Sequence, residues 1–210
     1  MRKRILVFGD SITYGDCDKE GGWVIRLRKF LDERQLDNYE TYNLGIPKDE
    51  ITKSLLKRFV NETKIRISNN IKRNIIIFAI GINDTEYNNS KKNTRYNLKR
   101  FKNNIQKLMK LSRKFSKSVL FVGLTPVDES RVDPIPWFKP YSYKNEYISK
   151  YNEIIKSVCN ENNVKFIEVF EVFMKLNYKN LLEDGAHPNS EGHKIIFEVV
   201  KDYLSKNKII

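Results

Sequence analysis

The stretch that decides the fold lies near the start of the chain, where residues 5–13 read Ile-Leu-Val-Phe-Gly-Asp-Ser-Ile-Thr. Four consecutive apolar residues are typical of a strand buried on both faces, and the glycine and polar residues that follow mark the turn at its end. The pattern therefore predicts that Ser11 lies on the turn that leaves a buried strand. A serine at such a turn either caps the next helix or serves as a nucleophile.

Similar apolar runs recur along the chain, separated by segments with helical spacing. The strand-like runs lie at 75–80, 119–124 and 164–169, with a shorter strand expected at 39–42. The helix-like segments lie at 23–36, 51–70, 94–115, 144–162 and 190–204. Strands that alternate with helices predict a parallel sheet covered on both faces, and no linker-like composition divides the chain. We therefore expect one α/β domain over residues 1–210, a three-layer α/β/α, flavodoxin-like doubly wound sheet of about five parallel strands.

The first of only two histidines, His187, follows Asp184 by three positions in a late loop. An imidazole can take the proton of a serine hydroxyl, and a carboxylate that binds the imidazole fixes its tautomer. Ser11, His187 and Asp184 are therefore candidates for nucleophile, base and orienting acid. The second histidine, His193, lies inside the last predicted helix, and we interpret it as structural or exposed.

Two further loops follow predicted strands and could complete a site at the same sheet edge. Asn83 follows the run at 75–80, and its amide could donate to an oxyanion, although asparagine is also common in turns. Gly45 follows the strand at 39–42, and a glycine there lets a backbone N–H approach a substrate oxygen. Because the carboxyl ends of parallel strands share one edge, these loops should converge with the loop that carries Ser11.

With these four blocks in order, the chain resembles the SGNH hydrolases, also called the GDSL lipase and esterase family. The four letters match Ser11, Gly45, Asn83 and His187, and the resemblance runs from residue 4 to about residue 205. It implies that Ser11 is the nucleophile, that His187 is the base and that Asp184 is its partner. It also implies an oxyanion hole made by the backbone N–H groups of Ser11 and Gly45 and by the Asn83 side chain.

The chain departs from the family pattern in two places. Ile12 stands where the family name has leucine, an exchange of one aliphatic residue for another. After Gly45 many members continue with a second glycine, whereas this chain runs Ile46-Pro47-Lys48. The pattern thus predicts the path of this second loop less closely than that of the others.

The resemblance implies a serine esterase or acylhydrolase that cleaves carboxylic esters through an acyl-enzyme. We expect a preference for short acyl or acetyl esters, with a small-molecule, lipid or sugar ester as substrate. A lysophospholipase or thioesterase is an alternative, as is a non-catalytic anion-binding protein. The oligomeric state stays open.

Two other chemistries could use residues of the same region. The thiol of Cys17 could rival Ser11 as a nucleophile, but no second histidine block is aimed at it. A Mg²⁺ or Mn²⁺ site could be suggested by Asp10, Asp16, Asp18, Asp184 and His187. Their spacing matches no recognised metal motif, and a serine mechanism needs neither metal nor cofactor, so none is expected.

The segment at 133–143 holds three prolines and four aromatic residues. It follows a predicted strand at the site edge, so Trp137, Phe138 and Tyr141 could line a substrate pocket. The same rings could instead pack over the domain or against a second subunit. Trp23, after Gly21-Gly22, is expected to anchor the core.

The formal net charge of +13 is concentrated between Lys91 and Lys117, where eleven Lys and Arg and no acidic residue occur. Such a run can contact an anionic surface, but apolar residues at helical spacing place the cations on a solvated helix face. No nucleic-acid motif is present, so no specific nucleic acid partner is expected.

The start of the chain carries Arg2-Lys3-Arg4 but then only four apolar residues before Gly9. A secretory segment needs about 7–15 apolar residues, and a membrane span needs about 20. The two cysteines are too few for a disulfide framework. These features predict a cytoplasmic protein.

Overall fold

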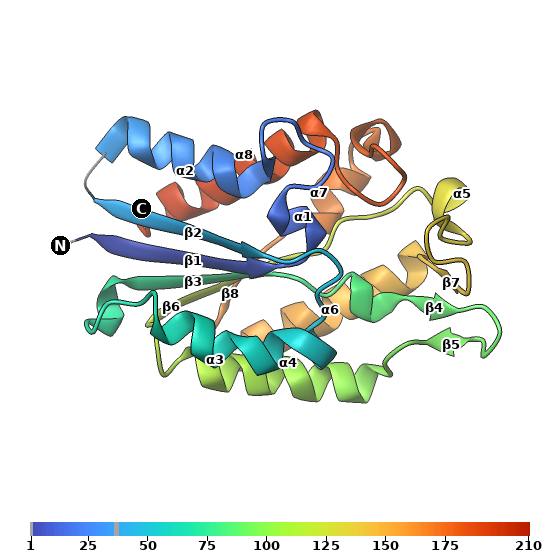
Figure 1. Cartoon of the computed structure of the whole chain (residues 1–210), viewed down its shortest axis with the longest axis horizontal. Helices are drawn as coiled ribbons and strands as arrows, with labels where there is room; N and C mark the ends of the chain where they lie inside the picture. The colour runs from blue at the N-terminus through green and yellow to red at the C-terminus, as the bar shows by residue number, and fades with distance from the viewer. Residues whose placement is uncertain (1, 36–37) are drawn as a thin grey trace.

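A computed structural model of the chain describes residues 2–35 and 38–210 and has a five-stranded parallel sheet at its centre (Figure 1). The strand order is β2-β1-β3-β6-β8. The bounds are β1 Lys3–Gly9, β2 Tyr39–Gly45, β3 Asn74–Ala79, β6 Ser118–Val122 and β8 Lys165–Ile167. All five predicted strands are present, and the predicted three-layer α/β/α architecture is confirmed.

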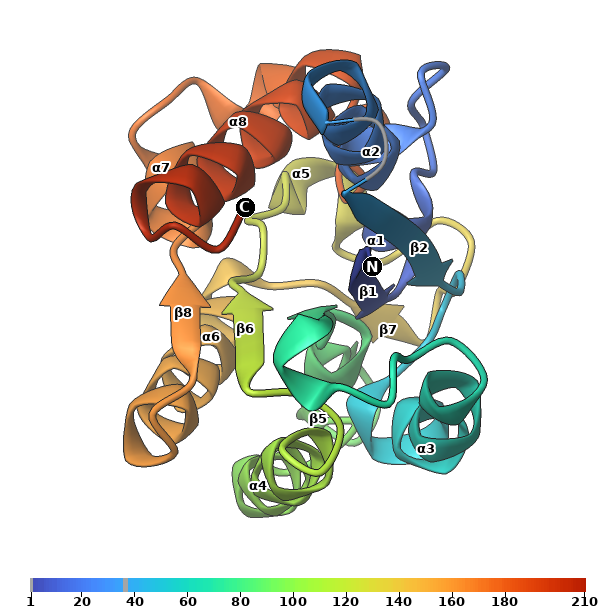
Figure 2. The ribbon, with the colours of Figure 1, turned by 90° about the vertical axis from the view of Figure 1, so that its left-hand side faces the viewer.

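Helices cover both faces of this sheet, as Figures 1 and 2 show. On one face lie α2 (Gly22–Gln35), α7 (Phe170–Met174) and α8 (Ser190–Lys206). On the other lie α3 (Leu56–Lys64), α4 (Leu98–Ser112) and α6 (Asn145–Glu161). Successive side chains of a strand point to opposite faces, so Leu6 of β1 packs into one core and Ile5 into the other. Trp23 is fully buried in the second core, as expected.

Short elements connect these layers, most of them near the carboxyl edge of the sheet. They are α1 (Ser11–Tyr14), the π-helical turn η1 (Ile51–Leu55), α5 (Glu129–Val132) and the 3₁₀ turns η2 (Ile71–Arg73), η3 (Asn83–Thr85) and η4 (Tyr178–Leu181). A small antiparallel sheet of order β5-β4-β7 joins β4 (Tyr87–Asn88), β5 (Asn93–Thr94) and β7 (Tyr141–Ser142). Strands of two residues leave no periodicity in the sequence, so this small sheet was not predicted.

Two predicted helices are shorter than their sequence patterns. The segment at 51–70 begins with η1 and ends its helix at Lys64, and the segment at 94–115 is helical from Leu98 to Ser112. Residues 93–94 pair in β5 instead, and the Asn97 side chain caps α4 by accepting the Arg100 N–H. The last residue of the predicted 23–36 helix, Leu36, lies outside the described residues.

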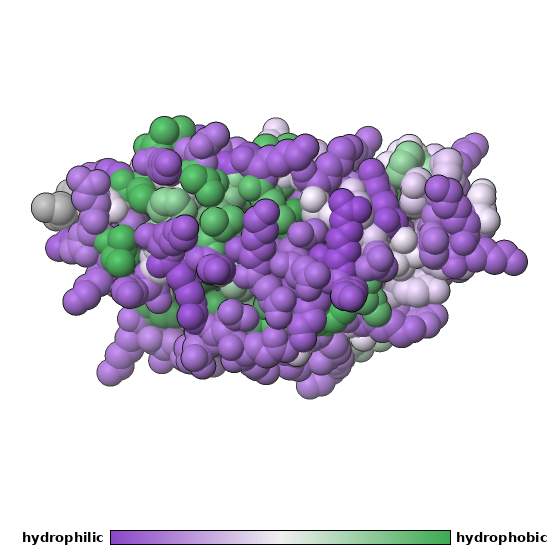
Figure 3. Space-filling view, turned by 90° about the horizontal axis from the view of Figure 1, so that it is seen from below, coloured by the Kyte–Doolittle hydropathy of each residue, from purple (hydrophilic) through white to green (hydrophobic). Residues whose placement is uncertain are grey.

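The basic segment forms α4 and its flanks. Its apolar stripe of Phe101, Ile105 and Leu108 is buried, and Lys107, Lys110 and the other cations of α4 lie on the outer side. Arg95, which precedes α4, instead pairs with Glu50 and Glu86. Figure 3 views this side of the molecule and shows a mostly hydrophilic surface. Over the described residues, no helix combines the length and the apolar character that crossing a bilayer requires.

Candidate active site

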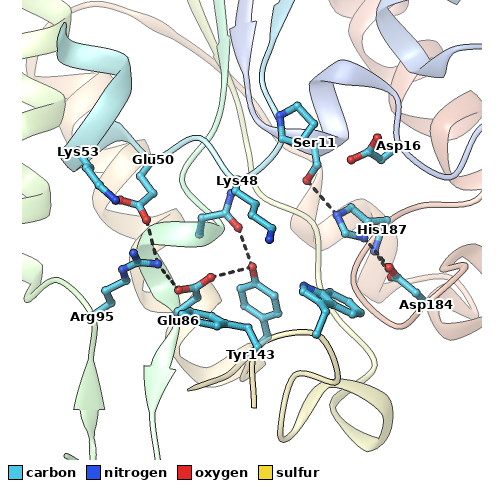
Figure 4. Close-up of a pocket in the computed structure, with 14 residues that line it drawn as sticks. Ser11, Asp16, Lys48, Glu50, Lys53, Glu86, Arg95, Tyr143, Asp184 and His187 are labelled. Atoms are coloured by element: carbon cyan, nitrogen blue, oxygen red, sulfur yellow. Dashed lines mark hydrogen bonds and ion pairs between the residues drawn. The ribbon is translucent and has the colours of Figure 1, made fainter. Parts of the chain in front are cut away.

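A cavity of about 560 Å³ opens at the carboxyl edge of the sheet, between the loops that follow β1, β2 and β3 and the late loop before α8 (Figure 4). Five segments distant in sequence supply its walls, because the aromatic segment at 137–143 contributes as well. The lining residues are Ser11, Asp16, Pro47, Lys48, Glu50, Lys53, Asn83, Glu86, Arg95, Trp137, Phe138, Tyr143, Asp184 and His187.

Ser11, His187 and Asp184 form a continuous hydrogen-bond chain on one wall. His187 Nε2 lies 2.9 Å from Ser11 Oγ, and His187 Nδ1 lies 2.6 Å from Asp184 Oδ2. The other Asp184 oxygen accepts the backbone N–H groups of Ala186 and His187, so the carboxylate is held at both oxygens. A neutral imidazole with Nδ1–H on the carboxylate presents Nε2 as a proton acceptor to the serine.

The two titratable partners shift each other's pKa in opposite directions. Burial raises the pKa of Asp184, but its hydrogen bonds with His187 and with backbone N–H groups outweigh burial and lower it to about 2. Burial lowers the pKa of His187, but the Asp184 hydrogen bond and the charges of Asp184, Asp10 and Asp16 outweigh burial and raise it above 6.5. Asp184 is thus ionised wherever His187 titrates.

The turn after β1 fixes the position of Ser11. Asp10 is the N-cap of α1 and accepts the Ile12 N–H at 3.1 Å, so Ser11 is the first residue of the helix rather than its cap. Asp10 is buried beneath this turn, and burial raises its pKa to about 7.

The structure differs from the sequence-based expectation at Gly45. Its N–H donates to Asn43 Oδ1 at 3.0 Å, and the residue does not line the cavity. A Cβ at this position would lie 2.2 Å from the Tyr14 backbone nitrogen. Glycine is needed here because β2 packs directly against α1, which is a structural reason and not a catalytic one.

Lys48, three residues further on, takes the place at the cavity that was expected for Gly45. It lines the cavity and has a φ of 64°, a left-handed conformation that favours glycine. None of the hydrogen bonds found in the described part of the chain uses the Lys48 N–H. The sequence signal that could have found this position is the second glycine that many similar proteins carry in this loop.

A buried ion pair holds the loop that carries Lys48. Arg58 of α3 donates to Asp49 Oδ2 from Nε at 2.8 Å and from a terminal nitrogen at 2.5 Å. The same guanidinium donates to the carbonyls of Leu44 and Gly9 at 2.9 Å and 3.3 Å. One arginine thereby ties together the ends of β1 and β2 and the loop after β2.

Asn83 is the first residue of η3, four positions after the end of β3, and its side chain is fixed at both ends. Its Nδ2 donates to the Asp49 carbonyl at 2.9 Å, and its Oδ1 accepts the Tyr143 hydroxyl at 2.7 Å. A side-chain amide carries two N–H groups, so the second N–H of Nδ2 stays available at the cavity.

A charged cluster forms the wall opposite His187. One terminal nitrogen of Arg95, Nη1, lies 2.9 Å from Glu50 Oε1 and 2.6 Å from Glu86 Oε2. The Tyr96 hydroxyl donates to the other oxygen of Glu50 at 2.7 Å. Figure 4 shows Lys53, Glu50, Arg95 and Glu86 on one side of the cavity and Ser11, Asp16, His187 and Asp184 on the other. Sequence reasoning missed this cluster because its members come from separate loops.

The aromatic segment contributes part of the lining that was expected of it. Trp137 and Phe138 line the cavity, and the Trp137 ring centroid lies 5.8 Å from that of His187. Tyr141 stacks on Phe138 with a centroid distance of 4.6 Å and does not line the cavity. Tyr143, which was not singled out, is buried and lines the cavity instead.

The structure also bears on the alternative nucleophile Cys17, on the second histidine and on the acidic residues considered as metal ligands. Burial and the nearby carboxylates of Asp184 and Asp16 raise the pKa of Cys17 to about 11, which disfavours a thiolate nucleophile. His193 is buried and its Nε2 bonds the Asp16 carbonyl at 3.0 Å, as a structural residue. Among the described residues, the one group of three potential metal ligands is Cys17, Asp184 and His187, rather than the acidic set considered from the sequence.

Comparison with family models and curated sequences gives one family match. A model of the GDSL-like lipase/acylhydrolase family matches residues 7–195. No curated protein sequence matches the chain.

Solved structures with the same fold span the whole chain. A lipase/acylhydrolase from Enterococcus faecalis is 19% identical with a TM-score of 0.78, and the match covers 99% of this chain and 97% of that one. An acetyl xylan esterase is 21% identical with a TM-score of 0.75, covering 96% and 99%. An acetyl xylan esterase variant from Geobacillus stearothermophilus is 20% identical with a TM-score of 0.71, covering 97% and 93%. At these identities the likeness shows the fold.

Proposed function

Because the chain belongs to the GDSL-like lipase/acylhydrolase family and is a carboxylic ester hydrolase, we propose that it acts through a serine acyl-enzyme with Ser11 as nucleophile. The observation that carries this proposal is the hydrogen-bond chain from Ser11 Oγ through His187 to Asp184 at the wall of the cavity. Serine attacks an ester when a neighbouring imidazole takes its proton and a carboxylate orients that imidazole.

Each step follows from this chain of hydrogen bonds. His187 Nε2 takes the Ser11 proton as Oγ forms a bond to the carbonyl carbon, and the imidazolium returns that proton to the departing alkoxide. Water then enters, gives a proton to His187 and attacks the acyl carbon, and the bond to Oγ breaks as His187 returns the proton to the serine. Asp184 stays ionised throughout and holds the imidazole.

Three donors are available for the negative charge that develops on the carbonyl oxygen. They are the backbone N–H of Ser11, the second N–H of the Asn83 amide and the backbone N–H of Lys48. We place Lys48 in this role instead of Gly45, since the Gly45 N–H already donates to Asn43. Removal of one such donor costs about 10²- to 10³-fold in kcat.

The cavity favours esters with a short or polar acyl group. The leaving oxygen must meet His187 Nε2, so the acyl half extends toward the wall formed by Glu50, Arg95 and Glu86 (Figure 4). A long aliphatic chain would strip water from these charges without replacing their hydrogen bonds. Two of the three solved structures described above are named acetyl xylan esterases, which agrees with acetyl esters as substrates. A lysophospholipase activity fits this wall less well, and thioesters stay an alternative.

A purely anion-binding protein is the competing class. The cations on the outer side of α4 would suit it, but an anion-binding face has no need for a serine, an imidazole and a carboxylate in one chain of hydrogen bonds. Contact of α4 with an anionic surface stays a separate prediction.

The test is hydrolysis of p-nitrophenyl esters, from acetyl to long acyl chains, by wild type and by Ser11→Ala. We expect turnover that falls with chain length in wild type and is lost in the variant. Equal turnover by folded Ser11→Ala would overturn the serine mechanism, and a long-chain optimum would overturn the short-acyl preference.

A further inference from the structure

The small sheet β5-β4-β7 brings three polar residues together beside the cavity. Glu86 precedes β4, Arg95 follows β5 and Tyr143 follows β7. Tyr87 of β4 pairs with Thr94 on one side and with Ser142 on the other, so the three polar residues are the next positions at the same end of the sheet. The Arg95 N–H donates to the Glu86 carbonyl at 2.7 Å, which continues the ladder by one residue.

From this arrangement we propose that Tyr143 is a positioning residue that fixes the orientation of the Asn83 amide, and that the Arg95–Glu86 pair keeps the Tyr143 proton on Asn83. The inference rests on the proposed function of Asn83 as an oxyanion donor. Under this proposal, the small sheet and its buried charged residues contribute to the same reaction by orienting the Asn83 amide.

The first step is that only one orientation of the Asn83 amide satisfies both of its neighbours. The Asp49 carbonyl can only accept, so the Asn83 nitrogen must face it at 2.9 Å. The Asn83 oxygen then faces the Tyr143 hydroxyl at 2.7 Å and receives its proton. With the amide reversed, two oxygens would face each other at Asp49, and a buried acceptor would be left unpaired.

The second step concerns the single proton of the Tyr143 hydroxyl. Asn83 Oδ1 at 2.7 Å and Glu86 Oε1 at 3.5 Å both compete for it. The Arg95 guanidinium satisfies the Glu86 carboxylate through Oε2 at 2.6 Å and so weakens its demand for the proton. Figure 4 shows Tyr143 between this pair and the catalytic wall.

The third step is that Tyr143 stays a donor at any working pH. It is 5% exposed, and burial together with the negative charges of Glu86 and Asp10 raises its pKa well above 10. The hydroxyl therefore keeps the one proton that it gives to Asn83.

The experiment is a double-mutant cycle between Tyr143→Phe and Asn83→Ala, read as kcat and KM on p-nitrophenyl acetate. We expect Tyr143→Phe alone to lower kcat at least about tenfold with KM little changed, because the lost interaction acts in the transition state. In the Asn83→Ala background, Tyr143→Phe should cost nothing further. An equal loss in both backgrounds, or no loss in the single variant, would overturn the inference.

A matched control separates positioning from stability. Tyr151 is also fully buried, and its hydroxyl donates to the backbone carbonyl of Tyr96 and not to Asn83. Tyr151→Phe should resemble Tyr143→Phe in urea unfolding and leave kcat unchanged; a kcat loss equal to that of Tyr143→Phe would mean that any buried tyrosine produces the effect.

A second variant keeps the inference testable if Tyr143→Phe folds poorly. Arg95→Met should lower kcat by freeing Glu86 to compete for the Tyr143 proton, and adding Glu86→Gln should restore part of the loss. A further fall in the double variant would overturn the inference. If Asn83→Ala itself has wild-type kcat, the proposed oxyanion role of Asn83 fails, whereas additive losses with an impaired Asn83→Ala leave that role intact and overturn only the role of Tyr143.

Discussion

Ser11 Oγ and His187 Nε2 lie 2.9 Å apart although 176 positions separate the two residues in the chain. Ser11 lies in the turn after the inner strand β1, and His187 lies in the loop before α8. The Leu182–Pro188 bridge and the bond from the Glu183 N–H to the His187 carbonyl, 2.8 Å long, shape that loop. The contact therefore depends on how two rigid elements are packed and not on local sequence.

Replacement of Asp184 by asparagine should move the pH profile as well as the rate. Ionised Asp184 raises the pKa of His187, and His187 must be neutral to accept the serine proton. In Asp184→Asn the acid limb of kcat/KM should shift to lower pH, and its plateau should fall roughly 10³- to 10⁴-fold because the imidazole loses its orienting partner.

Asp16→Asn is the control for this shift. Asp16 also raises the pKa of His187 by its charge, but it makes no hydrogen bond to the ring in the described structure. We expect a smaller shift in the same direction with most of the plateau retained. An unshifted acid limb in Asp184→Asn would contradict the electrostatic coupling.

The sequence predicted the main sheet because its strands are apolar on both faces. Runs such as 75–80 need no tertiary context to be recognised as buried strands. The small sheet β5-β4-β7 escaped because each of its strands has only two residues, and pairing with segments distant in the chain sets its register. The π-helical turn that begins at Ile51 could not be predicted from local sequence, because the distant Asp84 determines it by accepting the N–H groups of Ile51 and Thr52.

The candidate site was predicted where chemistry restricts residue type and missed where backbone geometry decides. A nucleophile, a base and an orienting acid require particular residue types, and the structure brings Ser11, His187 and Asp184 together. That Lys48 and not Gly45 lies at the cavity depends on a left-handed φ angle in this loop, which a lysine does not indicate as a glycine would. Which ring of the aromatic segment faces the cavity depends on the register of β7, so Tyr143 was passed over.

Loss of Arg58 should destabilise the protein far more than loss of a surface arginine. Asp49 and Arg58 have side chains only 1% and 13% exposed, and Arg58→Ala would leave a buried carboxylate without its partner. We expect about 3–5 kcal/mol less free energy of unfolding in urea. Arg28→Ala, which breaks the exposed pair with Asp32, should cost at most about 1 kcal/mol. Equal losses would show that Arg58 does not hold the loop.

Replacement of Lys48 by glycine tests whether its backbone or its side chain matters. Glycine adopts a φ of 64° without strain, so Lys48→Gly should relieve about 1 kcal/mol of strain, partly offset by the entropy of a freer unfolded chain. The N–H that we assign to the oxyanion is kept, so kcat should stay within about threefold of wild type, well short of the loss of a donor.

Lys48→Ala provides the comparison, because it removes the same side chain and keeps the left-handed strain. It should match Lys48→Gly in kcat and be the less stable of the two in urea unfolding. If both variants lost kcat by about 10²-fold or more, the ammonium group and not the backbone N–H would be the contribution of this residue.

Asp10 should make the protein less stable as pH rises from about 4 to about 7. Burial raises its pKa from 3.8 to about 7, so in this window the folded state holds a proton that the unfolded state has released. The free energy of unfolding therefore falls with rising pH across the window.

Replacement of Asp10 by asparagine should flatten this pH dependence in urea unfolding between about pH 4.5 and about pH 7.5. The introduced amide has no proton to lose, and its oxygen can still accept the Ile12 N–H. Burial also raises the pKa of Asp84 to about 7, so Asp84 accounts for the pH dependence of the free energy of unfolding that remains in this variant. Asp128→Asn is the control: hydrogen bonding to Ser130 lowers the pKa of Asp128, so its contribution is lost only below that window. A slope in Asp10→Asn as steep as in wild type would mean that Asp10 is already ionised in the folded protein at the lower pH.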